Sequence, residues 1–132
     1  MYMIVIGAEP EGRRFIAQAA EQSHEITLIE PDEDKARQVL KEHSVRVLKG
    51  SMGEDNVLQE ADIDRADALI ATTYDDAKNL MAIAIAKENN VKIRVSLVNH
   101  QSHQQLFKSF GAKVISDPAG IIASHLYQAL DQ

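Results

Sequence analysis

A glycine-rich turn near the amino terminus has the residue types and spacing of a phosphate-binding loop. An apolar run, Met3–Ile6, leads into Gly7-Ala8-Glu9-Pro10-Glu11-Gly12, where the dinucleotide-binding pattern G-x-G-x-x-G would lie. Gly7 would permit the tight turn and Gly12 would let a helix pack closely on a sheet, but Glu9 replaces the middle glycine. A side chain there occupies the path by which a pyrophosphate approaches the backbone, and its carboxylate repels phosphate.

Glu9 itself has two interpretations. Its carboxylate can turn back onto the unpaired backbone N–H groups at the start of the first helix, so that the protein carries its own phosphate mimic, or it can point to solvent from an exposed loop. Arg13 and Arg14 follow within one helical turn and could restore an anion site, although arginines on a helix surface are more often solvated.

An acidic residue, Glu30, ends the second apolar run, 23 positions after Gly7. An acid about 20 residues beyond the glycines binds a ribose hydroxyl in dinucleotide-binding folds, and it disfavours the 2′-phosphate of NADP. Glu30 therefore supports a nucleoside site. The alternative is that Glu30 simply belongs to an acidic helix start together with Asp32, Glu33 and Asp34.

No catalytic group is predicted, and we expect a protein that is not an enzyme. The chain has no cysteine, which removes thiolate nucleophiles, disulfides and cysteine-based zinc sites. Tyr74 and Lys78 have the Tyr-x-x-x-Lys spacing of short-chain dehydrogenases, whose lysine lowers the tyrosine pKa. The pair follows the fourth apolar run in a chain much too short for that family, so we interpret the spacing as coincidence.

No metal site is predicted either. His100 and His103 stand three positions apart, a spacing that can place two imidazoles on one metal, but no carboxylate follows at ligand spacing. A polar helix start explains this pair more simply. Asp75 and Asp76 are likewise explained by a helix N-terminus without any cation.

The elements that must position these residues alternate between strands and helices. Short apolar runs rich in β-branched residues recur along the chain, separated by segments of helical periodicity. The predicted strands are Met3–Ile6, Ile26–Ile29, Val45–Leu48, Ala68–Ala71, Ile93–Leu97 and Val114–Ile115. This alternation predicts an α/β fold: a Rossmann-like, doubly wound, six-stranded parallel sheet in a single domain over residues 1–132.

Composition excludes several classes of protein. In 132 residues, 20 Asp and Glu outnumber 14 Lys and Arg, giving a formal charge of −6, so the broad positive field that binds nucleic acid is absent. Apolar runs are shorter than the roughly 20 residues of a membrane span. The first residues, 1–7, also lack the basic region of a signal peptide. We therefore expect a cytoplasmic protein.

Taken together, these motifs resemble the TrkA-N domain family, also called KTN or the N-lobe of RCK domains. The stretches that carry the resemblance are Ala61–Ala71, Asn79–Lys87, Val98-Asn99 with Leu106-Phe107 and Gly111-Ala112, and Val114–Pro118. The resemblance covers nearly the whole chain and implies a dimerising Rossmann domain that controls potassium channels or transporters and binds adenine nucleotides or NAD(H). The cleft residues that it implies are Gly7, Glu9, Gly12, Glu30, Ser51, Met52, Thr72, Thr73 and Asn79.

The chain departs from the family pattern inside that cleft. Family members usually have glycine at the position of Glu9, often arginine at that of Pro10, and aspartate at that of Ser51, and an arginine common on the fifth strand corresponds to Leu97. Each departure removes a phosphate or base contact. We therefore expect AMP or an adenosine-like ligand, or no nucleotide at all, rather than NAD.

A homodimer or higher oligomer is expected from the segment Asn79–Lys87, where apolar residues cover every side of two helical turns. One face should meet the sheet and the other a second subunit, although exposed alanines alone would also explain the pattern. Because the chain starts at its first strand, we expect a separate subunit or soluble sensor, which would reach the inner face of the membrane through a potassium channel or transporter subunit.

The leading hypothesis is therefore a regulatory, ligand-sensing domain that controls potassium transport and has an altered adenine-nucleotide cleft. The alternative is a non-catalytic regulatory or dimerisation domain of a larger oxidoreductase or phosphoesterase, with a dead nucleotide site.

Overall fold

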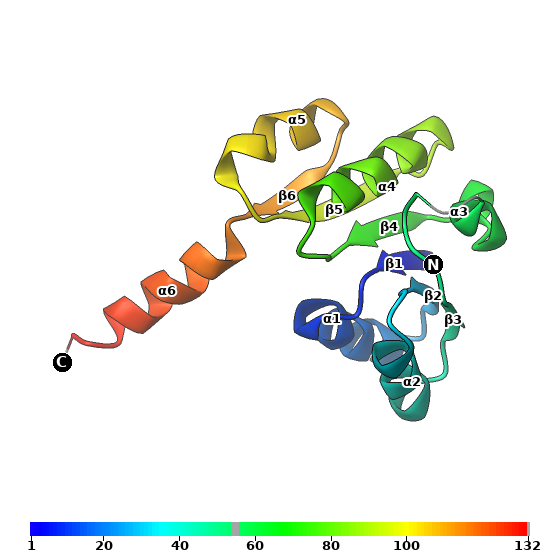
Figure 1. Cartoon of the computed structure of the whole chain (residues 1–132), viewed down its shortest axis with the longest axis horizontal. Coiled ribbons are helices and arrows are strands. Elements are labelled where there is room, and N and C mark those ends of the chain that lie inside the picture. Colours follow the sequence, from blue (N-terminus) through cyan, green and yellow to red (C-terminus); the bar gives the residue numbers. More distant parts are fainter. Residues whose placement is uncertain (54–55, 132) are drawn as a thin grey trace.

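Six parallel strands form one sheet in the order β3-β2-β1-β4-β5-β6 in the computed structural model, which describes residues 1–53 and 56–131 (Figure 1). The strands are β1 (Tyr2–Ile6), β2 (Glu25–Ile29), β3 (Arg46–Leu48), β4 (Ala68–Ala71), β5 (Ile93–Val98) and β6 (Lys113–Ser116). These bounds agree with the predicted strands to within two residues, and the doubly wound parallel sheet is confirmed.

Helices connect the strands and cover both faces of the sheet. They are α1 (Pro10–Glu21), α2 (Glu33–Glu42), α3 (Val57–Glu60), α4 (Asp76–Glu88), α5 (Gln104–Ser109) and α6 (Pro118–Gln128), with short 3₁₀ turns η1 (Ile63–Arg65) and η2 (Gln101–His103). The connection after β3 differs from the other crossovers because its helical part in the described residues is limited to α3 and η1.

Alternation of side chains along β1 divides the core into two layers. Ile4 is buried with Ile83 of α4 and Phe107 of α5 on one face, whereas Val5 is buried with Ile16 of α1 on the other. Because successive residues of a strand point to opposite faces, the continuous apolar sequence of β1 is what a sheet covered on both faces requires.

Aspartates begin three of the helices, and for two of them, Asp32 and Asp75, the sequence indicated a helix start. Asp32, Asp75 and Asp117 are the N-cap residues of α2, α4 and α6, and each accepts a hydrogen bond from a backbone N–H of the first turn. The N-termini of α2 and α4, which directly follow β2 and β4, lie at the carboxyl ends of the strands, where the candidate cleft is found.

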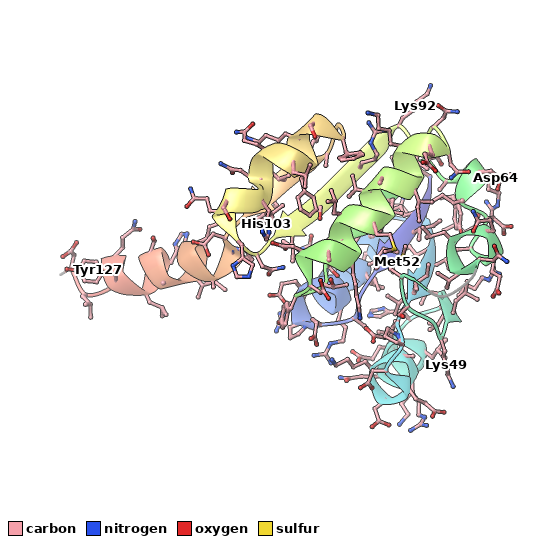
Figure 2. All side chains as sticks on the ribbon, turned by 45° about the horizontal axis from the view of Figure 1, so that its top comes forward. Lys49, Met52, Asp64, Lys92, His103 and Tyr127 are labelled. Carbon is pink, nitrogen blue, oxygen red and sulfur yellow. The ribbon has the colours of Figure 1, made fainter. Side chains whose placement is uncertain are left out.

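The last helix, α6, extends away from the sheet (Figure 1) and has no buried residue. Figure 2 shows Tyr127 near its end, far from the sheet. On α4, by contrast, Ala82, Ile83 and Ala86 are buried against the sheet while Met81 is exposed. Within the described residues, no helix is both long and apolar enough to span a membrane.

Candidate functional site

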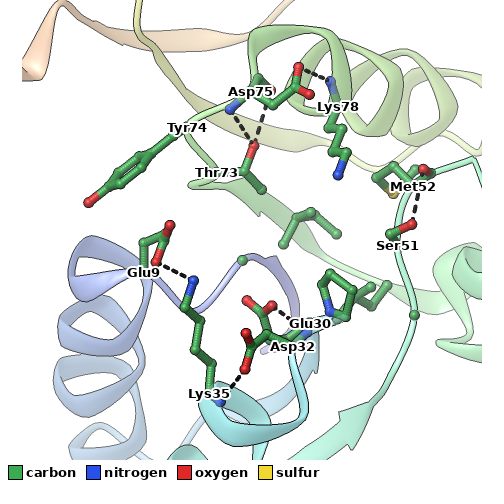
Figure 3. A pocket seen from close by; sticks show the side chains of 15 residues that line it. Glu9, Glu30, Asp32, Lys35, Ser51, Met52, Thr73, Tyr74, Asp75 and Lys78 are labelled. Atoms are coloured by element: carbon green, nitrogen blue, oxygen red, sulfur yellow. Dashed lines mark hydrogen bonds and ion pairs between the residues drawn. The ribbon is translucent and has the colours of Figure 1, made fainter.

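A cavity of about 380 Å³ lies at the carboxyl ends of β1, β2 and β4 (Figure 3). It opens where the strand order reverses between β1 and β4, which is the usual ligand position in open parallel sheets. The described residues that line it are Ile6, Gly7, Glu9, Ile29, Glu30, Pro31, Asp32, Lys35, Gly50, Ser51, Met52, Thr73, Tyr74, Asp75 and Lys78. Six of the nine sequence-predicted site residues are among them: Gly7, Glu9, Glu30, Ser51, Met52 and Thr73.

The two glycines of the turn have the structural roles that the sequence predicted. Gly7 has φ +100, and a Cβ there would lie 2.9 Å from Cγ2 of Thr73. A Cβ on Gly12 would collide with the Gly7 carbonyl oxygen and lie 2.6 Å from Oγ1 of Thr72. Gly12 therefore lets α1 pack against the ends of β1 and β4, and it lies behind the cavity wall.

Glu9 follows neither of its two predicted interpretations. It is the N-cap residue of α1, but its carboxylate makes no capping hydrogen bond, so the internal phosphate mimic is wrong. Nor does it simply point to solvent, because Oε1 lies 2.8 Å from Nζ of Lys35 on α2 and the side chain is only 26% exposed. The hydrogen bond to Glu9 raises the pKa of Lys35 above its ordinary value.

Glu30 is buried and connects two parts of the cleft wall. Its Oε1 accepts a 2.7 Å hydrogen bond from the Ala8 backbone N–H, and its Oε2 accepts a 2.9 Å bond from that of Asp32. Each carboxylate oxygen keeps a second lone pair, so Glu30 can still accept from a ligand hydroxyl. At 5% exposure it is more buried than the acids of the α2 start, although it accepts a hydrogen bond from the backbone of the first of them, Asp32.

Two structural hydrogen-bond groups, those of Thr72 and Asn79, lie beneath the cleft wall. Thr72 Oγ1 donates to the carbonyl of Ile6 at 2.9 Å, which joins the ends of β1 and β4. Asn79 accepts from the backbone and hydroxyl of Thr73 and donates to the carbonyls of Thr73 and Leu97. The resemblance implied that Thr72 and Asn79 are cleft residues. They hold the sheet ends together and are not among the described residues that line the cavity.

Ser51 and Met52 enter the cavity from the segment that follows β3. Met52 is 7% exposed and belongs to the core, so its side chain forms part of the apolar floor. The Ser51 hydroxyl contacts the Met52 carbonyl at 3.5 Å and lies on the cavity rim.

Sequence reasoning missed the two lysines of the cavity, Lys35 and Lys78. Each is the third residue after an N-cap aspartate, Asp32 or Asp75, at the start of a helix whose N-terminus faces the cavity. The repeated Asp-x-x-Lys after the second and fourth predicted strands was the available signal. Figure 3 shows the two side chains on opposite sides of the cavity.

Tyr74 bridges the two sides of the cavity mouth. Its hydroxyl donates a 3.0 Å hydrogen bond to Oε1 of Glu11 on α1. Burial and this hydrogen bond raise the pKa of Tyr74, which is opposite to the shift that a proton-transferring tyrosine needs. The Tyr74–Lys78 spacing therefore places two residues in one cavity without making a dehydrogenase pair.

Asp76 is buried beside the cavity, where it fastens the start of α4 to the end of β5. Its carboxylate accepts from both the backbone and side-chain N–H groups of Asn99, from the backbone of His100, and pairs with Nδ1 of His103 at 2.8 Å. Burial opposes ionisation, but these hydrogen bonds together lower the pKa of Asp76. His103 thus serves a structural pair, and the described residues contain no cluster of three potential metal ligands.

The fold and the cleft at the strand-order reversal define a Rossmann-like domain. A family model for the TrkA-N domain matches residues 3–118, and the chain belongs to this family. It is 26% identical over 126 residues to a "Trk system potassium uptake protein TrkA homolog" of Methanothermobacter thermautotrophicus, and 27% identical over 136 residues to that of Pyrococcus abyssi. These alignments cover 96% and 98% of this chain but only 58% and 60% of the relatives.

Solved structures share the fold at low sequence identity. The TrkA-N domain of the inner membrane protein ybaL from Escherichia coli superposes with a TM-score of 0.84 at 16% identity, covering 98% of this chain and 96% of that one. The NAD(P)-binding domain of an exopolyphosphatase-related protein from Archaeoglobus fulgidus gives 0.78 at 15% identity, covering 98% of both chains. The GsuK structure bound to ADP gives 0.75 at 20% identity, covering 87% of this chain and 31% of that one.

Proposed function

We propose that this chain is a non-enzymatic regulatory domain that senses an adenine nucleotide and controls potassium transport through a membrane partner. The match to the TrkA-N domain over residues 3–118 carries this proposal, together with curated relatives that are named as potassium uptake proteins. The cavity supports it because Glu30 lines the wall at the end of β2, where an acid accepts a ribose hydroxyl in dinucleotide-binding folds.

The ligand we propose is a mononucleotide or nucleoside rather than NAD. The ion pair of Glu9 with Lys35 and the Tyr74–Glu11 hydrogen bond both lie near the start of α1, where a pyrophosphate would bind. Each would have to break or move before a dinucleotide could cross from the Glu30 side to the β5 side of the cleft.

We propose that the domain is not an enzyme because its curated relatives are named as potassium uptake proteins. Tyr74 fits this proposal, because its raised pKa is opposite to the shift that a proton-transferring tyrosine needs. The alternative function is a non-catalytic domain of a larger oxidoreductase or phosphoesterase. A domain of that kind would have the same cleft. The identity of the partner protein or fused domain therefore distinguishes it from a regulator of potassium transport.

We further propose that the domain forms a homodimer or higher oligomer through α6, with α4 contributing. Ile122, Leu126 and Tyr127 are exposed on α6, and Met81 on α4. An isolated helix of 11 residues is only marginally stable in water. Packing of the apolar side of α6 on a second subunit would stabilise this helix. We place such an assembly in the cytoplasm, at the inner face of the membrane through its transport partner.

Thermal unfolding against AMP, adenosine, ADP, ATP, NAD and NADH tests the ligand class. A ligand at about 100 times its Kd stabilises the fold by roughly 2.7 kcal/mol, which raises Tm by several degrees. We expect AMP or adenosine to raise Tm and NADH to leave it unchanged. If none of the six raises Tm, the sensing function is wrong and a dimerisation scaffold with a dead cleft replaces it.

A further inference from the structure

Each of the other charged side chains that line the cavity bonds to another group of the protein through its charged end. The amine of Lys78, in contrast, has no acidic partner among the described residues. Figure 3 shows it pointing from α4 into the cavity, on the side opposite Glu30. Lys35, the other lysine of the wall, already pairs with Glu9 at 2.8 Å. Lys78 is therefore the cation that the described cavity leaves for a ligand.

The acids around Lys78 have other partners in the protein. Glu30 accepts from two backbone N–H groups, and Asp75 accepts from those of Ala77 and Lys78 at the start of α4. Asp32 accepts from the Lys35 backbone N–H at the start of α2. These bonds hold each carboxylate against a helix start or turn and leave the Lys78 amine directed into the open cavity.

The usual phosphate position at the start of α1 is, in contrast, unsuitable. Pro10 is the first residue of α1 and has no N–H to donate. The Glu9 carboxylate stands beside it, and the Tyr74 hydroxyl crosses to Glu11 over the same helix start. An anion placed there would meet two carboxylates and one fewer backbone donor.

We propose that Lys78 binds the phosphate of a nucleoside monophosphate whose ribose hydroxyl is accepted by Glu30, so that the phosphate site has moved from α1 to α4. This inference rests on the proposed nucleotide-sensing function and assigns the ligand group to a residue. Because four carboxylates and two amines line the described cavity, a single phosphate is favoured and each additional phosphate meets repulsion. AMP should therefore bind more tightly than ADP or ATP.

Calorimetric titration of AMP and adenosine into the whole chain separates the phosphate contribution from that of the nucleoside. The wild type should bind AMP about tenfold more tightly than adenosine, as expected for one charge-assisted contact. Lys78→Gln should lower AMP affinity to the level of adenosine and leave adenosine affinity unchanged. Lys78→Arg should keep most of the preference for AMP.

Lys92→Gln is the matched control, because Lys92 is also exposed and lies at the opposite end of α4 from the cavity (Figure 2). It should leave both affinities unchanged, which excludes a general effect of net charge. Far-ultraviolet circular dichroism and Tm establish that each variant is folded before titration.

Three results would overturn the assignment. If Lys78→Gln keeps the wild-type AMP affinity, the phosphate lies elsewhere, and the proposed function survives. If it loses adenosine and AMP equally while folded, Lys78 contacts the nucleoside instead of the phosphate. If the wild type binds neither compound, the proposed nucleotide sensing fails and this inference fails with it.

Discussion

Glu30 illustrates how one residue can serve both the fold and the ligand. Its two oxygens join the glycine turn to the start of α2 through the backbone N–H groups of Ala8 and Asp32. The ribose acceptor proposed here is therefore held in place before any ligand binds, which lowers the ordering cost of binding.

Replacing Glu30 by glutamine should destabilise the domain as well as weaken nucleoside binding. The amide offers one acceptor oxygen in place of two, so one buried N–H loses its partner at a cost of about 1–3 kcal/mol. Urea unfolding measures the loss, with Glu42→Gln on the exposed side of α2 as the control. Equal stability of wild type and Glu30→Gln would show that the two backbone bonds contribute little.

The variant Glu9→Gly tests whether the Glu9 side chain excludes dinucleotides from the cleft. The change removes the side chain from the phosphate path and releases Lys35 from its ion pair, so we expect NADH to bind measurably where the wild type ignores it. Fluorescence titration with NADH provides the readout. Glu9→Ala removes the charge but keeps a Cβ, so it separates repulsion from steric blocking. If Glu9→Gly still ignores NADH, the Tyr74–Glu11 bridge becomes the barrier to test.

The start of α4 shows how an element is fixed by buried electrostatics. Asp76 accepts from Asn99 and His100 and pairs with His103, which fastens α4 to the end of β5. Asn79, one turn further along α4, binds the carbonyl of Leu97. The cavity residues Thr73 and Lys78 lie on either side of Asp76 in the sequence, so the contacts of Asp76 also fix their positions.

Stability should depend on the ionisation of Asp76. Despite its burial, hydrogen bonds from Asn99, His103 and His100 lower the folded-state pKa of Asp76 below its unfolded value. Its contribution is thus complete above the unfolded pKa of about 3.9 and is lost as the pH falls through the folded pKa. Urea unfolding between pH 7 and pH 2 should show this loss in the wild type.

Asp76→Asn supplies the comparison for the pH series. The variant should be less stable at pH 7, and its stability should fall less steeply in the acid range because the titrating carboxyl is gone. Parallel curves for the two proteins across the acid range would contradict the assigned role of Asp76.

Sequence reasoning was most successful where a local pattern determines the structure. Gly7, Gly12 and the N-cap aspartates Asp32 and Asp75 were recognisable because turns, close packing and capping depend on nearby residues. The Glu9 partner was not, because Lys35 lies 26 positions away and meets it only through the arrangement of α1 and α2.

Contacts between residues that are distant in the sequence also explain why the roles of Asn79 and Lys78 were not predicted. Asn79 was assigned to the cleft by resemblance, yet its amide is occupied by Thr73 and Leu97, which are brought together by β4–β5 pairing. Lys78 was discounted as part of a chance motif, and only the convergence of the α2 and α4 starts places it in the cavity.

At the scale of the whole molecule, a short series of hydrogen bonds connects the start of α6 to the cleft. Its N-cap residue Asp117 donates its backbone N–H to Val98 at 2.7 Å, and Val98 precedes Asn99, which contacts both Thr73 and Asp76. A ligand can influence the assembly only if it binds one arrangement of subunits better than another. This connected set of contacts is where we expect such a difference to be expressed.

Leu126→Glu tests the proposed role of α6 in assembly. Leu126 is 68% exposed in the single chain, so a charge there should cost the isolated domain little but should weaken a subunit interface. Sedimentation equilibrium should show a dimer or larger species for the wild type and a shift toward monomer for the variant. Ser124→Glu adds the same charge at a polar position and should assemble normally. A monomeric wild type would rule out α6 as a self-association surface under those conditions.

The central position of β1 also determines when the sheet can form during protein synthesis. β1 pairs with β2 early in the chain, but its other edge pairs with β4, more than 60 residues later. Until Ala68–Ala71 has left the ribosome, β1 presents an open, apolar edge that can recruit strands from other chains. Nascent chains stalled before β4 should therefore be the species most prone to aggregation and most dependent on chaperones.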